Sequence, residues 1–75
     1  MNIMNQEIQQ GIIKRFFANK GYGFITPDAG GEDVFFHYSQ IKDDKSDSVK
    51  EGQKVSFSIV RGAKGLQASS VELLN

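Results

Sequence analysis

Short runs of β-branched and aromatic residues alternate along the chain with polar clusters that contain glycine. None of these runs shows apolar residues at the three- and four-residue spacing of an amphipathic helix. Short runs bounded by turn residues are typical of β-strands. The sequence therefore predicts an all-β fold with five strands, enough to close a small barrel, at residues 11–17, 21–26, 33–38, 53–61 and 66–73.

The segments outside the predicted strands are mostly polar. Residues 42–52 form the longest connection, and their mixed charge predicts a solvated, mobile loop. Residues 39–41 fit a single helical turn. The first residues are polar and have no evident strand partner, which predicts a flexible N-terminal segment at 1–8 and a single folded domain at 9–74.

The direction of each side chain follows from alternation, because residues two apart on a strand share a face. Phe35 shares its face with His37, and Phe16 shares its face with Lys14, so both rings are expected to point outward. The interior can be filled from every strand without them. The expected core residues are Ile13, Ile25, Val34, Phe36, Ile41, Val55, Phe57, Ile59, Ala68, Val71 and Leu73.

The second predicted strand is ambiguous from alternation alone. Tyr22, Phe24 and Thr26 share one face, and Gly23 and Ile25 share the other. Glycine in a strand fits a position where one backbone approaches another closely. This favours the glycine side as the interior, with Tyr22 and Phe24 outward.

Size and charge restrict the possible partners. The chain has 75 residues, with nine Lys plus Arg against nine Asp plus Glu. A chain of this size has room for one modest core and no second domain. Its zero net charge argues against a protein that holds duplex DNA by bulk electrostatics, because such domains usually carry a basic excess.

Several functional classes lack their sequence signatures. With no Cys and one His, there is no basis for a disulfide framework or a zinc cluster, and no metal or cofactor is expected. No nucleophile or phosphate-binding motif is present, so an enzyme is not expected. The apolar runs are too short to span a bilayer and the N-terminus is unlike a secretory signal, which predicts a cytoplasmic protein without membrane contact.

Basic residues are interleaved with the rings that are expected to point outward. The segment 11–26 contains Lys14, Arg15 and Lys20 and no acidic residue, and His37 follows on the next predicted strand. A single-stranded nucleic acid needs this combination, since rings stack on bases and cations meet phosphates. The alternative is that the aromatic residues simply fill the core.

Two segments resemble the ribonucleoprotein motifs of the cold-shock domain family. Residues 20–25 (KGYGFI) are similar to the first motif and residues 34–38 (VFFHY) to the second. They occur in the family's order and at its spacing, and the likeness covers roughly residues 10–73. The resemblance implies a five-stranded antiparallel barrel of the oligonucleotide/oligosaccharide-binding (OB) type, whose second and third strands present a stacking surface.

The resemblance also implies a function. The expected partners are single-stranded RNA and single-stranded DNA, with a preference for pyrimidine-rich sequence. Binding only the open strand shifts the equilibrium toward it, so the implied activity is that of an ATP-independent RNA chaperone, with roles in the cold-shock response, transcription or translation. A monomer is expected. The residues alone leave open a protein-interaction module that uses the same aromatic patch, such as a strand-exchanged homodimer.

The resemblance assigns contacts to individual residues by position. The residues that it implies in base stacking are Phe16, Tyr22, Phe24, Phe35, His37 and Tyr38. The residues that it implies in other contacts are Lys14 and Lys20 toward the phosphates, Asp33 toward a base edge, and Lys64 and Gln67 at the rim.

The chain departs from the family pattern at four positions. Arg15 stands where the family most often has Trp, and Ser46 lies near a position where a loop aromatic is common. A guanidinium can stack on a base and pair with phosphate, so Arg15 is kept as a candidate binding residue. Leu66 replaces a frequent Pro. Phe17 replaces Asn and fits either an extra stacking position or the core, of which the core is favoured.

Overall fold

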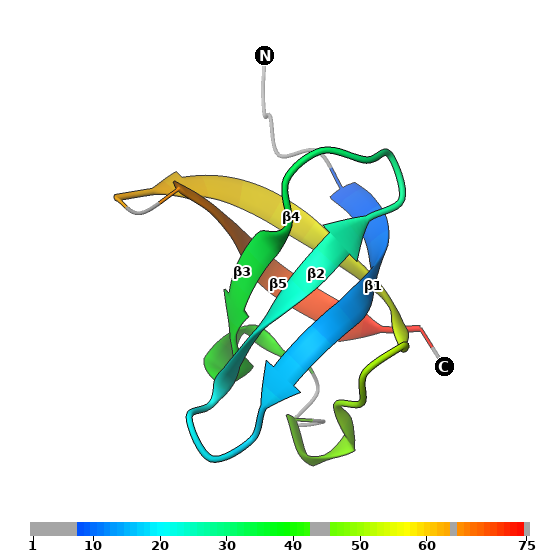
Figure 1. Cartoon of the computed structure of the whole chain (residues 1–75), viewed down its shortest axis with the longest axis vertical. Helices are drawn as coiled ribbons and strands as arrows, with labels where there is room; N and C mark the ends of the chain where they lie inside the picture. Colours follow the sequence, from blue (N-terminus) through cyan, green and yellow to red (C-terminus); the bar gives the residue numbers. More distant parts are fainter. Residues whose placement is uncertain (1–7, 43–45, 64, 75) are drawn as a thin grey trace.

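The computed structural model describes residues 8–42, 46–63 and 65–74, and in them five strands close into a barrel (Figure 1). The order around the barrel is β1-β2-β3-β5-β4, and β4 and β5 cross behind the other three strands in the view of Figure 1. The elements are β1 (Ile8–Phe17), β2 (Tyr22–Pro27), β3 (Val34–His37), β4 (Lys54–Gly62) and β5 (Gly65–Leu73), with the 3-10 turns η1 (Tyr38–Gln40) and η3 (Ser46–Ser48) between β3 and β4. The predicted all-β barrel and the helical turn after the third strand are confirmed. No helix in this part of the chain is long and apolar enough to cross a membrane.

Most neighbouring strands of the barrel are antiparallel, as expected. The contact between β3 and β5 is parallel and is made through Phe35 and Gln67. A parallel pair requires a crossover connection, and here the chain passes from β3 to β4, on the far side of β5, before it returns. One parallel pair therefore closes an otherwise antiparallel barrel.

The first strand starts earlier than the sequence indicates. Ile8 pairs with Ser58 of β4, and the polar residues Gln9 and Gln10 continue the same ladder. Ile8 was expected in the flexible N-terminal segment, and Gln9 and Gln10 were expected in the domain but before its first strand. Polar side chains give no strand pattern in the sequence, but the ladder is formed by backbone groups, which pair whatever the side chains are. The rest of the predicted flexible segment lies outside the described residues.

The barrel interior contains nearly all of the expected core. The buried apolar residues are Ile13, Ile25, Val34, Phe36, Ile41, Val55, Phe57, Ala68 and Val71. Ile59 and Leu73, also expected in the core, are half-buried and pack against it. Every strand contributes at least one of these side chains, which is what a closed barrel with a single interior requires.

The second half of the long connection is bound to the barrel rather than solvated throughout. Val49 packs against the core. The amide of Gly52 donates to the carbonyl of Ile13 at 2.7 Å, and the amide of Ile13 donates to the carbonyl of Gln53 at 2.9 Å. Val49 is therefore an exception to the solvated loop expected over 42–52, whereas residues 47–48 and 50–52 are exposed as expected, and residues 43–45 lie outside the described chain.

A β-bulge in β1 changes which of its side chains point outward. The register against β2 shifts by one residue between Ile13 and Arg15, and Lys14 is the extra residue. An extra residue reverses the alternation for the rest of the strand. Phe16 therefore points toward the core, where it packs, and Phe17 points outward.

Gly23 marks the interior side of β2, as expected. It is buried, and a Cβ in its place would meet the carbonyl oxygen of Arg15 and lie 2.9 Å from Cε1 of Phe36. Only a residue without a side chain allows β1 and the Phe36 ring to approach so closely. The opposite face of the strand carries Tyr22 and Phe24.

Candidate nucleic-acid interface

Four half-buried rings from three adjacent strands form a continuous surface outside the barrel: Phe17, Tyr22, Phe24 and Phe35, here called the aromatic face. The ring centroid of Tyr22 is 5.4 Å from that of Phe17 and 5.5 Å from that of Phe35. The ring of Phe24 lies 6.2 Å from Tyr22 and 6.0 Å from Phe35. The outward directions expected for Tyr22, Phe24 and Phe35 are confirmed.

Phe16 and Phe17 exchange the positions expected for them. Phe16 pairs with Gly23, and its ring stacks on that of Phe36 with centroids 5.9 Å apart. The prediction that Phe16 points outward is wrong, and so is the core position favoured for Phe17, which contacts Tyr22 instead. Both errors have one cause, the bulge in β1, because strict alternation was assumed across it.

His37 and Tyr38 extend the aromatic face at the end of β3, and both are exposed. Their ring centroids are 4.7 Å apart. The backbone amide of Ser39 donates to Nδ1 of His37 at 3.1 Å, which leaves Nε2 as the protonated nitrogen of the neutral ring. His37 pairs with Tyr22 across the strands, so its ring edge carries a hydrogen-bond donor beside the stacking surface.

A charged cluster lies at the other end of the aromatic face. Nζ of Lys14 donates to Oδ2 of Asp33 at 3.0 Å, and Oγ1 of Thr26 donates to Oδ1 at 3.1 Å. The hydrogen bond from Lys14, helped by the one from Thr26, outweighs the opposing effect of desolvation and lowers the pKa of Asp33. Asp33 is thus held as a carboxylate, with a direction fixed by two neighbours.

The remaining predicted cations differ in how they are placed. Arg15 is exposed and pairs with Phe24 across the strands, which puts the guanidinium on the side of the aromatic face. Lys20 is exposed in the turn that joins Phe17 to β2, where its amide donates to the Phe17 carbonyl at 2.9 Å. Lys64 lies outside the described residues.

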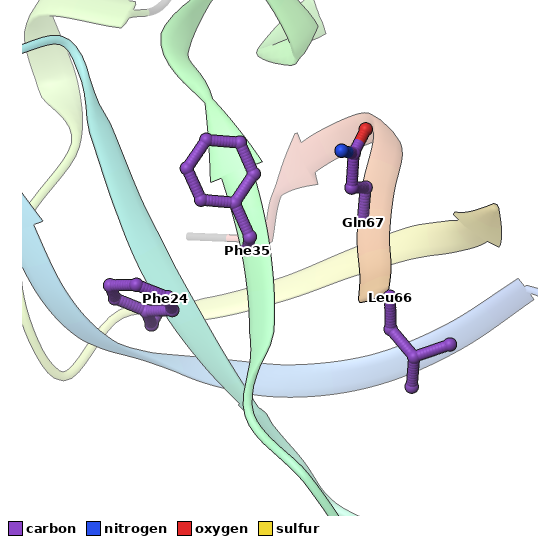
Figure 2. Close-up of a pocket in the computed structure, with 4 residues that line it drawn as sticks. All are labelled: Phe24, Phe35, Leu66 and Gln67. Atoms are coloured by element: carbon purple, nitrogen blue, oxygen red, sulfur yellow. The ribbon is translucent and has the colours of Figure 1, made fainter. Parts of the chain in front are cut away.

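A cavity of about 240 Å³ opens between β2, β3 and β5 beside the aromatic face. Phe24, Phe35, Leu66 and Gln67 line it (Figure 2). In Figure 2, Phe35 and Gln67 extend to the same side and Leu66 extends to the other. The structure thus brings Gln67 to the site, as expected, through the parallel pair with Phe35. Leu66 was noted only as a departure from the family pattern, and the surface position of Phe17 was the less favoured of two alternatives.

These residues together offer rings for stacking, cations for phosphates and polar groups for base edges. Phe17, Tyr22, Phe24 and Phe35 supply the rings, and Lys14, Arg15 and Lys20 supply positive charge on the same side of the barrel. A row of outward-facing rings flanked by cations is the arrangement that binds single strands with little dependence on sequence.

Comparison with known proteins agrees with this arrangement. A family model described as "'Cold-shock' DNA-binding domain" matches residues 9–74. The cold shock-like protein CspA of Bordetella pertussis is 48% identical over 67 residues, which are 89% of this chain and 100% of that protein. CspA of Stigmatella aurantiaca is 56% identical over 61 residues, 81% of this chain and 90% of that protein. CspG of Shewanella violacea is 52% identical over 64 residues, 85% of this chain and 91% of that protein.

A solved structure shares the same barrel. The structure titled "drosophila Unr CSD456" superimposes with a TM-score of 0.79 over 93% of this chain, at 24% sequence identity. The match occupies 28% of that longer chain. At this identity the likeness shows the fold, a five-stranded barrel of the OB type.

Proposed function

Since the chain belongs to the cold-shock domain family, we propose that it binds single-stranded RNA and single-stranded DNA through the aromatic face. The observation that carries the proposal is the contact of four outward rings across β1, β2 and β3. Rings held by neighbouring rings are already ordered, so little side-chain entropy is lost when a base stacks on them. Lys20 meets the phosphates at the edge of this face, and Lys14 and Arg15 add positive charge beside it.

The expected affinity is modest. Stacking contributes about 1 to 3 kcal/mol per base, so three stacked bases would give about 3 to 9 kcal/mol before ordering costs. Micromolar binding corresponds to about 8 kcal/mol. The chain also lacks the Trp that the family most often has at Arg15. We therefore expect micromolar or weaker binding to a short strand, with pyrimidine-rich sequence preferred overall.

Binding of this kind makes the protein an RNA chaperone that needs no ATP. Bases that stack on the protein do not stack or pair within the RNA, so binding draws weak secondary structure toward the open strand by mass action. The chain acts by binding and not by catalysis, as a cytoplasmic monomer, and the family membership favours roles in the cold-shock response, transcription or translation.

The chaperone activity is tested with a short RNA hairpin that carries a fluorophore and a quencher at its ends. The protein is expected to raise the fluorescence without ATP, and the variant F24A/F35A is expected to lose most of this effect. Ile8→Ala is the matched control, because Ile8 is an exposed apolar residue, 68% accessible, at the opposite end of β1 from Phe17. A hairpin that stays closed at protein concentrations that saturate a U-rich strand would refute the chaperone activity.

A further inference from the structure

A second cavity, of about 370 Å³, lies on the outer side of β1 and β2 at the bulge. It is lined by Lys14, Arg15, Phe17, Phe24 and Asp33. Two of these residues, Arg15 and Phe17, are where the chain departs from the common family pattern, and the bulge turns both of them outward.

The cavity combines stacking rings with hydrogen-bonding groups of opposite type. Phe17 and Phe24 provide aromatic surface, on which any base can stack. Asp33 is a carboxylate and can only accept hydrogen bonds, whereas the Arg15 guanidinium can only donate them. A base that binds both groups must therefore offer donors to Asp33 and acceptors to Arg15.

Asp33 keeps capacity for a ligand despite its two existing bonds. Oδ2 accepts from Lys14 and Oδ1 accepts from Thr26. Each carboxylate oxygen has two lone pairs, so one on each oxygen remains. Lys14 and Thr26 fix the direction of the carboxylate and leave one lone pair on each oxygen for further donors.

Guanine matches this set of groups better than the other bases. Its N1–H and N2–H₂ groups are adjacent donors that suit the two oxygens of a carboxylate, and its O6 and N7 are adjacent acceptors that suit the fork of Arg. Uracil has a single N–H donor. Cytosine and adenine each present one amino group as their only edge donor, so neither gives a carboxylate two donor groups.

We propose that this cavity is a guanine-selective subsite within the single-strand binding surface. Arg15 binds O6 and N7, Asp33 accepts from N1–H and N2–H₂, and the base stacks on Phe24 and Phe17. Lys14 is a positioning residue that holds Asp33. The inference rests on the proposed binding of single strands. It adds one position at which guanine is preferred, in a bound strand that is otherwise pyrimidine-rich.

The test measures fluorescence anisotropy of labelled seven-nucleotide RNAs: oligo-U, and oligo-U with one G at each position in turn, with A and C series for comparison. One G position is expected to tighten binding at least about fivefold over oligo-U, which corresponds to about 1 kcal/mol, the lower end for a bidentate contact to a base. A and C at that position are expected to change binding less than about twofold.

Substitutions of residues that line the cavity test whether the preference for G arises there. Arg15→Gln and Asp33→Asn are each expected to reduce the ratio of G-containing to all-U affinity to about one. Lys20→Gln is the control, because Lys20 is a cation near the same surface but does not line the cavity. It is expected to weaken binding of both strands and leave their ratio unchanged.

The outcomes separate the two proposals. No saturable binding of any strand at low salt would refute single-strand binding itself. Binding of oligo-U with no gain from G at any position would refute the guanine subsite alone. A preference for G that survives both Arg15→Gln and Asp33→Asn would also refute it, because the base would then be read elsewhere.

Discussion

The ring of Phe16 stacks on that of Phe36 with centroids 5.9 Å apart and planes 11° from parallel. This contact joins β1 to the core beside Gly23, which pairs with both residues across the strands and leaves room for the Phe36 ring. The next residue, Phe17, points to the other side and contacts Tyr22. Two adjacent phenylalanines therefore serve different purposes, one in stability and one at the surface.

Alanine substitutions at these two positions are expected to separate stability from binding. Phe16→Ala removes a half-buried ring from the core and is expected to lower the free energy of unfolding by about 2 to 3 kcal/mol. Phe17→Ala is expected to cost about 1 kcal/mol of stability, the value of one aromatic contact, and to weaken oligonucleotide binding about fivefold or more. Denaturant unfolding and anisotropy titration measure the two effects. Equal loss of stability in both variants would contradict their placement.

Gly23 is expected to tolerate no side chain. In Gly23→Ala the new methyl group meets the Arg15 carbonyl and the Phe36 ring, and a loss of about 3 kcal/mol or more is expected from this overpacking. Gly30→Ala is the control. Its Cβ would have no atom within 4 Å, although its φ of +91° makes a cost of about 1 kcal/mol expected from the backbone alone. Thermal unfolding followed by circular dichroism distinguishes them, and similar losses in both variants would contradict the close approach.

The titration of Asp33 tests the charged cluster at the end of the aromatic face. The hydrogen bonds from Lys14 and Thr26 hold the pKa of Asp33 below its ordinary value of 3.8. Because the folded-state pKa is the lower one, the carboxylate stabilises the fold above pH 3.8, and this contribution is lost as the pH falls through the folded-state pKa.

An NMR titration of the Asp33 carboxyl carbon is expected to give a midpoint below 3.8 in the wild type. In Lys14→Gln the midpoint is expected to move up, because the hydrogen bond from Lys14, which is the largest cause of the lowered pKa, and the positive charge of Lys14 are both removed. A midpoint that Lys14→Gln leaves unchanged would show that the ion pair does not form in solution.

The sequence predicts the barrel well where strands follow simple alternation. Val34 and Phe36 were expected inside and Phe35 outside, and the structure agrees, because β3 carries no irregularity. Gly23 also predicted correctly which face of β2 is interior, because a residue without a side chain fits where two backbones approach closely.

The sequence fails where the backbone departs from regular geometry or forms bonds that side chains do not reveal. No glycine near Lys14 indicates a bulge in the sequence, so Phe16 and Phe17 were assigned to the wrong sides of the strand. The strand at Gln9 was missed because its partner on β4 lies far along the chain. The cavity lined by Arg15 and Asp33 depends on both the bulge and this long-range packing, and no local pattern predicts it.

Arg15→Trp is expected to have opposite effects on two ligands. An added ring on the aromatic face should tighten oligo-U binding by about 1 kcal/mol, or about fivefold, the value of one additional stack. The same change removes the guanidinium that binds O6 and N7, so the preference for a G-containing strand should disappear. Anisotropy titrations of the two strands measure both effects. Unchanged or weaker oligo-U binding would place residue 15 away from the path of the strand.

The most direct measurement is a calorimetric titration of the wild-type protein and of Phe24→Ala and Phe35→Ala with oligo-dT and oligo-U at low salt, with Ile8→Ala as the control. The wild type and the control are expected to bind saturably with micromolar affinity. Each ring variant is expected to lose about 1 to 3 kcal/mol of binding free energy, the contribution of one stacked base, while remaining folded. Saturable binding that neither ring variant weakens, or no binding by the wild type, would contradict recognition of single strands by the aromatic face.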